Sequence, residues 1–376
     1  MSGEKSAGPP QAFLLPLGGA DAAQRRPRGP QHVGVAGAGL VGRLFAWALS
    51  QAGHKVEVFE AGPGPEPRFD GQGAAAFSAA GMLSPLAELD AAEPEVAARG
   101  FESLRLWPLI AARLSGQPTM QMDGSLLLAH RQDLGAAERV LARLRVSGFP
   151  AAQSLSEAEL AALEPALLRG LRAWRLPGEG FINPLEAMTA LQQDSQARWH
   201  WRRPVIAVEP GRLKLADGVD LRFDWIVDAR GLGAKPQLPL RGVRGEVITL
   251  SLANHGLTRP VRLLHPRHRV YLVPRSRDQL VLGASEIESE DRSPVSLQSA
   301  VELMAAAHSV MPTLAEARIE RLDVNLRPAL NDNRPFAHCE PGLLQLNGLY
   351  RHGWLLAPAL VQELLLASGL ANLEKP

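Results

Sequence analysis

The stretch HVGVAGAGLVGRLFAWALSQAGHKVEVFEA, residues 32–61, contains the strongest indication of the fold of this chain. An apolar run over 32–36 leads into the glycine motif GAGLVG at 37–42, and a helical pattern continues to Ala52. A second apolar run then ends at Glu60. This order of strand, glycine-rich turn, helix and strand is typical of a βαβ unit that binds a dinucleotide.

Each glycine of the motif has a separate physical role. Gly37 permits the tight turn, Gly39 lets a pyrophosphate approach the backbone, and Gly42 lets the helix pack closely on the strand. The helix N-terminus offers unpaired N–H groups and the positive end of its dipole to that pyrophosphate. Glu60 ends the second strand, where its carboxylate can accept hydrogen bonds from ribose hydroxyls. The unit alone leaves FAD and NAD open, and its place at the first folded residues favours FAD by analogy.

Length, charge and cysteine content limit the other possibilities. A chain of 376 residues exceeds what one hydrophobic core comfortably supports, which favours two domains or one discontinuous pair. A net charge of +1 argues against nucleic acid as a partner, because backbone binding depends on many uncompensated cations. The single cysteine, Cys339, excludes an internal disulfide or a paired-cysteine metal site. It fits a reducing, cytoplasmic location, and we expect no bound metal.

Residues 1–31 are interpreted as a flexible tail. Their apolar segment AFLLPLGG is too short and too rich in Pro and Gly for a signal sequence, and the basic QRRPRGPQ follows it. Elsewhere no apolar run reaches the roughly 18 residues that a membrane span needs. We therefore expect no association with a membrane.

Helical and extended patterns alternate through the rest of the chain. Ser156 and Glu159 form a capping box at the start of one helix, and Asp217-Gly218 indicates a β-hairpin, as does the turn at 276–278. Expected helices cover 97–115, 134–147, 157–168, a segment from Pro184 onward and 296–309. Expected strands include 124–130, 198–201, 205–210, 212–215, 219–223, 225–231, 319–326 and 343–348, followed by a closing helix.

These patterns predict an α/β fold with two parts. A Rossmann-like βαβ domain is expected over 32–95, 180–236 and 326–370, so the chain leaves this domain and returns to it. The second part, of α+β character with a mostly antiparallel sheet, is expected over 96–179 and 237–325. We assign the first part to the nucleotide and the second to the substrate.

Several stretches in one order carry a resemblance to a known family. They are VGVAGAGLVG (33–42), SAAGMLSP (78–85), VRGEVITL (243–250), YLVPR with LVLGAS (271–285), LRPALNDNRP (326–335) and GLYRHGWLLAP (348–358). They resemble the glycine oxidase (ThiO-like) branch of the D-amino-acid-oxidase-like, FAD-dependent oxidoreductases. The resemblance covers nearly the whole folded chain.

The resemblance implies a bound FAD. Ala80, Gly81 and Met82 would lie along the flavin, Val205 would meet the adenine end, and the loop 349–355 would wrap the pyrimidine edge of the ring. The implied FAD-binding residues are Gly37, Gly39, Leu40, Val41, Gly42, Glu60, Ala61, Ala80, Gly81, Met82, Val205, Leu349, Tyr350, Arg351, His352, Gly353, Trp354 and Leu355.

The resemblance also implies a site for an amino acid. Arg327 matches the family's carboxylate clamp, in which a planar guanidinium meets the acid through two parallel hydrogen bonds. Tyr271, Arg351 and Met82 match the remaining substrate positions. For Arg275 and Arg292 we expect solvated surface charges instead.

The implied reaction is oxidation of glycine or another small amino acid or amine. Hydride would pass from Cα to flavin N5, giving an imine, and oxygen would accept the electrons to give hydrogen peroxide. Hydride transfer from a neutral amine needs no dedicated base, so no residue is assigned as a catalytic acid or base. Implied partners are the amino acid, oxygen, a thiazole synthase of thiamine biosynthesis and a second copy of the chain.

Three features depart from the family pattern. His352 stands where Asn is common, and Glu286 stands where an apolar residue can sit, which puts the substrate in question. The turn DARG at 228–231 is either close to the FAD pyrophosphate or part of a structural salt bridge. Alternative functions are an amine dehydrogenase with another electron acceptor, the FAD domain of a tRNA-modifying enzyme, and a non-catalytic flavin-binding subunit.

Overall fold

A computed structural model describes residues 29–89, 93–146, 148–264 and 269–375. The expected flexible tail, 1–31, lies outside these residues except for 29–31. Within the described ranges, no helix combines the length and apolar character that a membrane span needs.

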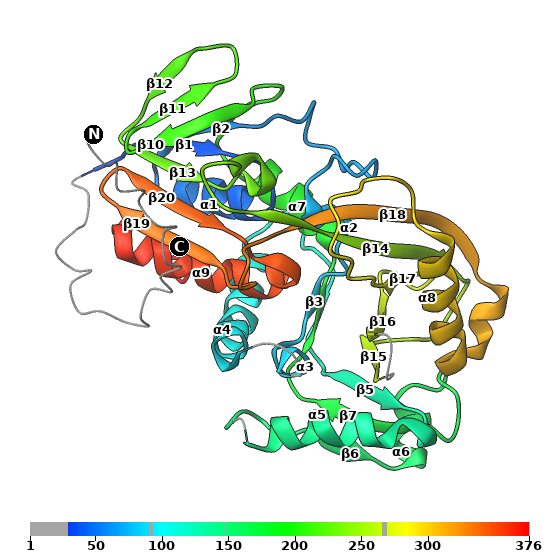
Figure 1. The fold of residues 1–376 in the computed structure, drawn as a ribbon. Coiled ribbons are helices and arrows are strands. Elements are labelled where there is room, and N and C mark those ends of the chain that lie inside the picture. Colours follow the sequence, from blue (N-terminus) through cyan, green and yellow to red (C-terminus); the bar gives the residue numbers. More distant parts are fainter. Residues whose placement is uncertain (1–28, 90–92, 147, 265–268, 376) are drawn as a thin grey trace, which may run out of the picture.

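A six-stranded sheet is built from three distant segments of the chain (Figure 1), with the strand order β19-β20-β13-β1-β2-β9. All neighbours are parallel except for the edge pair β19 and β20. The glycine motif lies between the first strand and helix α1 (Leu40–Gln51), as predicted. The strands are β1 (His32–Ala36), β2 (Lys55–Phe59), β9 (Arg198–His200), β13 (Trp225–Asp228), β19 (Phe336–Glu340) and β20 (Leu343–Asn347).

Four helices form the main hydrophobic core with this sheet: α1, α4 (Pro94–Ala111), α7 (Pro184–Gln193) and α9 (Gly353–Ser368). Trp107 of α4 stacks on Trp354 of α9 with 5.4 Å between ring centroids, and its indole N–H donates to the Trp354 carbonyl at 2.9 Å. Helix α4 therefore packs with the nucleotide part, although the expected boundary at residue 96 assigned most of it to the other part. We propose that the boundary between the two parts lies after the end of α4, at Ala111.

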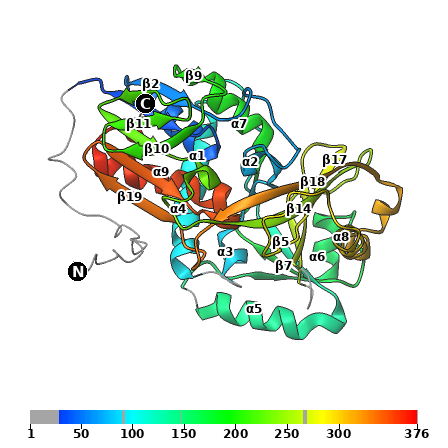
Figure 2. The same ribbon diagram turned by 45° about the horizontal axis from the view of Figure 1, so that its top comes forward.

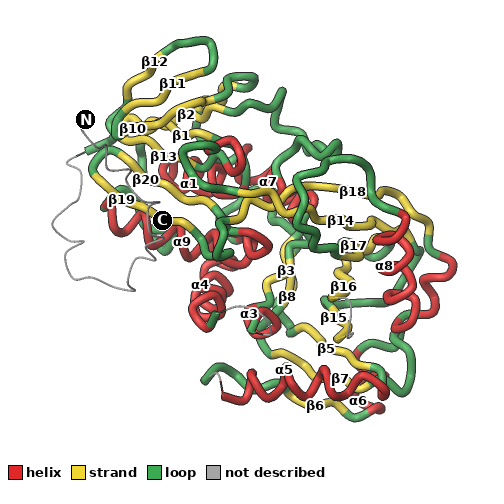
Figure 3. The backbone as a smooth tube through the Cα atoms, viewed as in Figure 1, coloured by secondary structure: helices red, strands yellow, loops and turns green. Residues whose placement is uncertain are grey.

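An eight-stranded, mostly antiparallel sheet forms the second part (Figure 2), with the order β18-β14-β17-β16-β15-β5-β7-β6. Its strands are β5 (Ser125–Ala129), β6 (Gln153–Leu155), β7 (Arg172–Leu176), β14 (Arg241–Ser251), β15 (Val261–Leu264), β16 (Arg269–Pro274), β17 (Gln279–Gly283) and β18 (Arg318–Ala329). Helices α5 (Leu134–Val146), α6 (Glu157–Leu163) and α8 (Leu297–Val310) lie at the far end from α1 and α9 (Figure 3).

Two small sheets and several short helices complete the fold. Strands β3, β8 and β4 form one small sheet, and β10, β11 and β12 form the other. Their bounds are β3 (Met82–Leu83), β4 (Met120–Gln121), β8 (Gly180–Ile182), β10 (Val205–Glu209), β11 (Arg212–Leu215) and β12 (Asp220–Arg222). The short helices are α2 (Ala75–Ser78), α3 (Pro85–Glu88), η2 (Arg131–Asp133), η3 (Gly231–Ala234), η4 (Pro312–Glu316) and η5 (Tyr350–His352).

The predicted α/β class is confirmed, and so are the capping box at Ser156 and the hairpin at Asp217-Gly218. The helix expected over 157–168 is too long, because α6 ends at Leu163. Glu164 precedes a proline, which disfavours helical backbone. Its carboxylate is buried and accepts from the Arg259 guanidinium at 2.7 Å instead.

Candidate functional site

A cavity of about 440 Å³ lies between the parallel sheet and the long strands β14 and β18. Its walls come from segments far apart in the sequence: the glycine motif, residues 72–84, the turn at 229–233, β14, β16, β18 and the loop 346–355. The predicted nucleotide motif and the predicted substrate residues Arg327 and Tyr271 thus share one cavity.

The glycine motif has the shape that a dinucleotide requires. A side chain on Gly42 would collide with the carbonyl oxygen of Gly37, so the helix can approach the strand only with glycine at this position. Gly39 faces open space, with the Ala74 side chain 3.9 Å from where a Cβ would lie. Gly39 is also the N-cap of α1 and makes no side-chain capping bond, so the first N–H groups of the helix stay available.

Glu60 closes the motif on its second strand. Its carboxylate accepts from the N–H of Ala38 at 2.7 Å and from the N–H of Gly62 at 2.8 Å. These bonds hold the acid beside the glycine turn, where a ribose would be recognised. The residues present therefore fit the predicted FAD at its nucleotide end.

Residues 80–82 form a close-packed wall of the cavity. Gly81 has a φ of 73°, and a side chain there would meet the Pro184 ring at 2.9 Å as well as the Ile182 carbonyl. The absence of a side chain at Gly81 lets the backbone pack against β8, and Ala80, Gly81 and Met82 all line the cavity. Their contact with the flavin stays a prediction.

The loop 349–355 forms another part of the wall, and all its residues line the cavity. Tyr350 has a φ of 52°, a conformation that is uncommon for a residue other than glycine. The Trp354 indole N–H donates to the Ala76 carbonyl at 3.2 Å, which ties the loop to the 72–84 segment. Burial lowers the pKa of His352 to about 4, so this imidazole is neutral at neutral pH.

Arg327 projects from β18 across its strand partner β14. Its guanidinium lies over Gly245, and a Cβ added at Gly245 would overlap the guanidinium. It donates to the carbonyls of Arg244 at 3.3 Å and Ser285 at 3.0 Å. Among the described residues, no carboxylate forms an ion pair with it. The guanidinium is therefore free to bind an acid group of a ligand.

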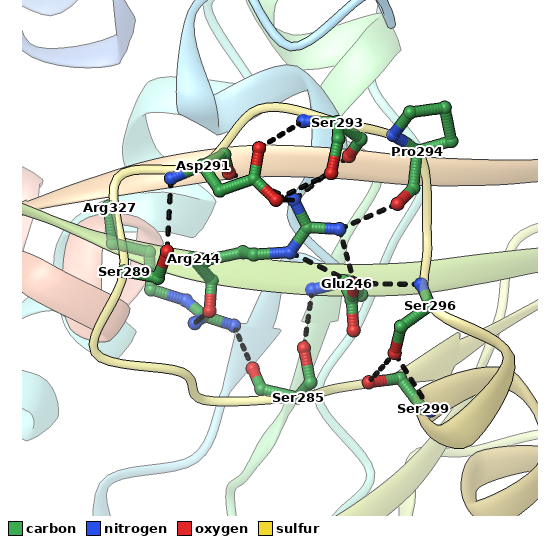
Figure 4. Close-up of polar contacts among 10 residues, drawn as sticks. All are labelled: Arg244, Glu246, Ser285, Ser289, Asp291, Ser293, Pro294, Ser296, Ser299 and Arg327. Atoms are coloured by element: carbon green, nitrogen blue, oxygen red, sulfur yellow. Dashed lines mark hydrogen bonds and ion pairs between the residues drawn. The ribbon is translucent and has the colours of Figure 1, made fainter.

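A buried network behind Arg327 holds its carbonyl partners in place (Figure 4). The Arg244 guanidinium is ion-paired with Glu246 at 2.6 Å, and both flank Gly245. It also donates to backbone carbonyls of the loop that follows Ser285, which pins this loop against β14. These acceptors are the carbonyls of Asp291 at 2.9 Å, Ser293 at 2.8 Å and Pro294 at 2.8 Å.

Tyr271 lies on β16 opposite Gly283 of β17. Its ring covers Gly283 so closely that a Cβ added there would lie 2.5 Å from the Tyr271 hydroxyl oxygen. Burial raises the pKa of Tyr271, while Arg327 and Arg262 act in the opposite direction. The hydroxyl therefore stays protonated at neutral pH and can donate a hydrogen bond.

Arg351 lines the cavity, but its guanidinium forms ion pairs with two carboxylates. It contacts Glu88 at 2.7 Å and Glu286 at 3.2 Å. Glu88 also pairs with Arg262 at 2.9 Å. Burial alone would raise the pKa of Glu88, but Arg262, Arg351 and His352 together hold it well below its usual range.

A second cavity of about 780 Å³ lies behind Arg351. It shares two stretches of wall with the first cavity, residues 284–286 and 350–352. The ion pair between Arg351 and Glu286 lies in this shared wall. Glu286, the departure noted in the sequence, is thus part of the site.

Two arginines expected to be solvated are not. Arg275 is 8% exposed, and its Nη2 donates to the Ala79 carbonyl at 2.6 Å. Burial lowers its pKa to about 10. Arg292 is half-buried, lines the cavity and donates to the Gly71 carbonyl. Both predictions are wrong because each guanidinium reaches a backbone carbonyl of a segment distant in sequence.

Other predicted positions differ in their surroundings. The turn 228–231 lines the cavity and also contains an ion pair, since Arg230 contacts Asp228 at 2.8 Å. Ala61 is exposed, and Val205 is packed in a hydrophobic cluster with its carbonyl accepting from Arg230 at 3.3 Å. Neither is among the described residues that line the cavity, and their role at FAD stays a prediction.

Sequence reasoning missed Glu88 and Arg262. Each signal was present but weak: a charged residue within a short apolar stretch, PLAEL at 85–89 and VRLL at 261–264. A functional role for either residue becomes evident only from the folded structure, in which the two side chains form an ion pair at the cavity wall.

Comparisons with known proteins agree with this arrangement. The model of the DAO family, FAD dependent oxidoreductase, matches residues 32–364. The chain is 37% identical over 335 residues to "Putative thiamine biosynthesis oxidoreductase ThiO" of Rhizobium etli, covering 88% of this chain and 94% of that protein. It is 27% identical over 349 residues to the glycine oxidase of Bacillus licheniformis, covering 86% and 89%. The crystal structure of glycine oxidase from Geobacillus kaustophilus has the same fold, with a TM-score of 0.76 at 24% identity over 89% of this chain and 94% of that one.

Proposed function

Because this chain belongs to the DAO family of FAD dependent oxidoreductases, we propose that it oxidises the amine of glycine or of another small amino acid. The observation that carries the proposal is Arg327, an arginine without an acid partner among the described residues, in the same cavity as the glycine motif. A substrate carboxylate would complete its hydrogen bonds.

The residues around Arg327 would orient the substrate. Two parallel hydrogen bonds from its guanidinium would fix the carboxylate, which limits the rotation of a molecule as small as glycine. The Tyr271 hydroxyl, protonated at neutral pH, would donate a further hydrogen bond. Met82 would cover the apolar side of the substrate.

The site also favours the neutral amine. An ammonium group entering a buried cavity that already contains guanidinium groups is disfavoured by desolvation and by like charge. The amine therefore loses a proton on binding, without a dedicated base. Bound FAD would supply the two-electron oxidation that gives an imine, and oxygen as the final acceptor would give hydrogen peroxide.

The relative from Rhizobium etli supports a role in thiamine biosynthesis, with the imine passing to thiazole formation. A thiazole synthase is then the expected protein partner. The proposal also includes the cytoplasm as the location.

The decisive experiment uses the purified FAD-containing protein. Its visible spectrum is recorded during anaerobic mixing with glycine, sarcosine, D-alanine and D-proline in turn. Bleaching of the flavin by one of them supports the proposal, and peroxide formed under air identifies oxygen as the acceptor. A protein that takes up FAD but is bleached by no small amine would contradict it.

A further inference from the structure

The charges around Tyr271 do not balance. Five charged side chains line this part of the cavity among the described residues: Arg262, Arg327, Arg351, Glu88 and Glu286. Glu88 pairs with Arg262 and Arg351, and Glu286 pairs with Arg351. Among the groups that line this part of the cavity, three guanidinium groups thus face two carboxylates, which leaves one positive charge, that of Arg327.

Glu88 has a larger influence on this balance than Glu286. The Glu88 side chain is 12% exposed and uses both carboxylate oxygens, one for each arginine. The Glu286 side chain is 46% exposed, so solvent screens its charge. The His352 imidazole contacts Glu88 at 3.4 Å but is neutral at neutral pH.

Two nitrogen atoms near Glu88 lack a partner. The Nε atoms of Arg262 and Arg351 are buried without a hydrogen bond, and only the Nη2 atom of each contacts Glu88. Without the negative charge of Glu88, these two guanidinium groups would add an uncompensated positive charge to the cavity. Arg275 does not line the cavity, and its Nη2 donates to the Ala79 carbonyl. Its charge acts on Tyr271, but it is the same in every variant compared below, so it does not change the comparison.

We infer that Glu88 restricts the site to substrates with a single carboxylate. The inference rests on the proposed function and defines its substrate class. Arg327 binds the one acid group, and Glu88 neutralises the two arginines that would otherwise attract a second. A dicarboxylate would place its second acid next to Glu88, where like charges repel. Glu88 is thus a specificity-determining residue.

The test measures binding rather than turnover. FAD-loaded protein is titrated with glycolate and with malonate, a matched pair with one and two carboxylates and no amine to oxidise. The change in flavin absorption yields the dissociation constant of each. We expect the native protein to bind glycolate more tightly than malonate by about tenfold or more, as one uncompensated charge predicts.

The variant Glu88→Gln should lower this preference by about tenfold, because Arg262 and Arg351 lose their shared partner. Glu286→Gln serves as the matched control and should change it by only a few-fold, since its charge is screened. The double variant Glu88→Gln with Arg262→Gln restores one net positive charge and should recover the native preference. A merely structural role for Glu88 would not produce that recovery.

Three results would overturn the inference: a native protein that does not discriminate or binds neither ligand, an FAD-loaded Glu88→Gln variant with the native ratio, or a double variant that keeps the ratio of Glu88→Gln. If Glu88→Gln does not fold, Arg262→Gln replaces it. This variant removes the net charge and should weaken glycolate binding about tenfold, and unchanged binding would refute the idea. Absence of bleaching by any amine would contradict the proposed function separately.

Discussion

At the scale of single residues, the partners of a charge distinguish its role. Arg327, Arg351 and Arg262 all line the cavity, but only Arg327 has carbonyls and no carboxylate as its described partners. A compensated guanidinium binds an anion weakly, because the incoming acid must compete with one already in place. We therefore propose that substrate binding depends most on Arg327.

We expect Arg327→Ala to raise the apparent KM for glycine strongly. Loss of a charge-assisted hydrogen-bonded pair costs roughly 1.5 to 3 kcal/mol, or about ten- to a hundredfold or more in affinity. Steady-state kinetics with matched FAD content measures the effect. Arg321→Ala on the same strand is the control, since Arg321 pairs with Asp323 at 2.7 Å and is not part of the described cavity wall. An unchanged KM in Arg327→Ala would remove Arg327 from this role.

We expect Glu179 to make the stability of the protein depend on pH. Its carboxyl is fully buried and accepts from the N–H of Leu86 at 2.7 Å and of Ala87 at 3.1 Å. Burial raises its pKa to about 7 from the model-compound value of 4.5. Between these values the unfolded chain is ionised while the folded protein keeps its proton, so the free energy of unfolding falls as pH rises through this window.

The variant Glu179→Gln resembles the protonated acid and should lack this dependence. Between about pH 5 and about pH 8, the Tm of the native protein should therefore fall relative to the Tm of the variant. Each unit of pKa shift corresponds to about 1.4 kcal/mol. Thermal unfolding across this range measures it, and a constant difference would contradict the assignment.

At the scale of elements, glycines make room for the functional side chains of neighbouring strands. Gly245 on β14 lies beneath the Arg327 guanidinium of β18, and Gly283 on β17 lies beneath the Tyr271 ring of β16. Both side chains extend over the adjacent strand instead of projecting perpendicular to the sheet. The antiparallel register therefore decides where the two groups point.

We expect Gly245→Ala to displace the Arg327 guanidinium and raise the KM for glycine by about tenfold or more, with FAD content unchanged. Gly64→Ala is the control, because no atom lies within 4 Å of the added carbon. Kinetics and the ratio of flavin to protein absorbance give both readouts. A normal KM in Gly245→Ala would show that the clamp tolerates displacement.

A second glycine substitution tests the nucleotide end. Gly42→Ala places a carbon against the Gly37 carbonyl, so α1 must move away from the turn that we expect to hold the pyrophosphate. We expect the purified variant to lose most of its FAD, as the visible spectrum would show. Retention of FAD at the native level would contradict this account of the motif.

At the scale of the whole molecule, the cavity is assembled from both large sheets. Its wall extends from Gly37 in the first βαβ unit to Leu355 at the start of the last long helix. A ligand that contacts all these segments binds only the folded chain. FAD should therefore stabilise the protein as a unit rather than one part of it.

Addition of FAD to apoprotein should raise Tm in a concentration-dependent way. The expected gain is about 2.7 kcal/mol at a hundredfold excess over Kd. NAD at the same concentration should give no comparable shift, which also settles the alternative that the glycine motif alone left open. Differential scanning fluorimetry or calorimetry measures both, and equal shifts with the two dinucleotides would contradict the assignment.

The βαβ unit, the mixed architecture and the glycine motif could be predicted from the amino-acid sequence, because hydrophobic periodicity and glycine spacing are local properties of the chain. Which arginines are buried, and which of them pair with a carboxylate among the described residues, became clear only from the folded arrangement. The burial of Arg275, the shared pairing of Glu88 and the carbonyl contacts of Arg327 all depend on segments separated by many residues. Electrostatic balance is a property of neighbours in space, and sequence periodicity contains no information about it.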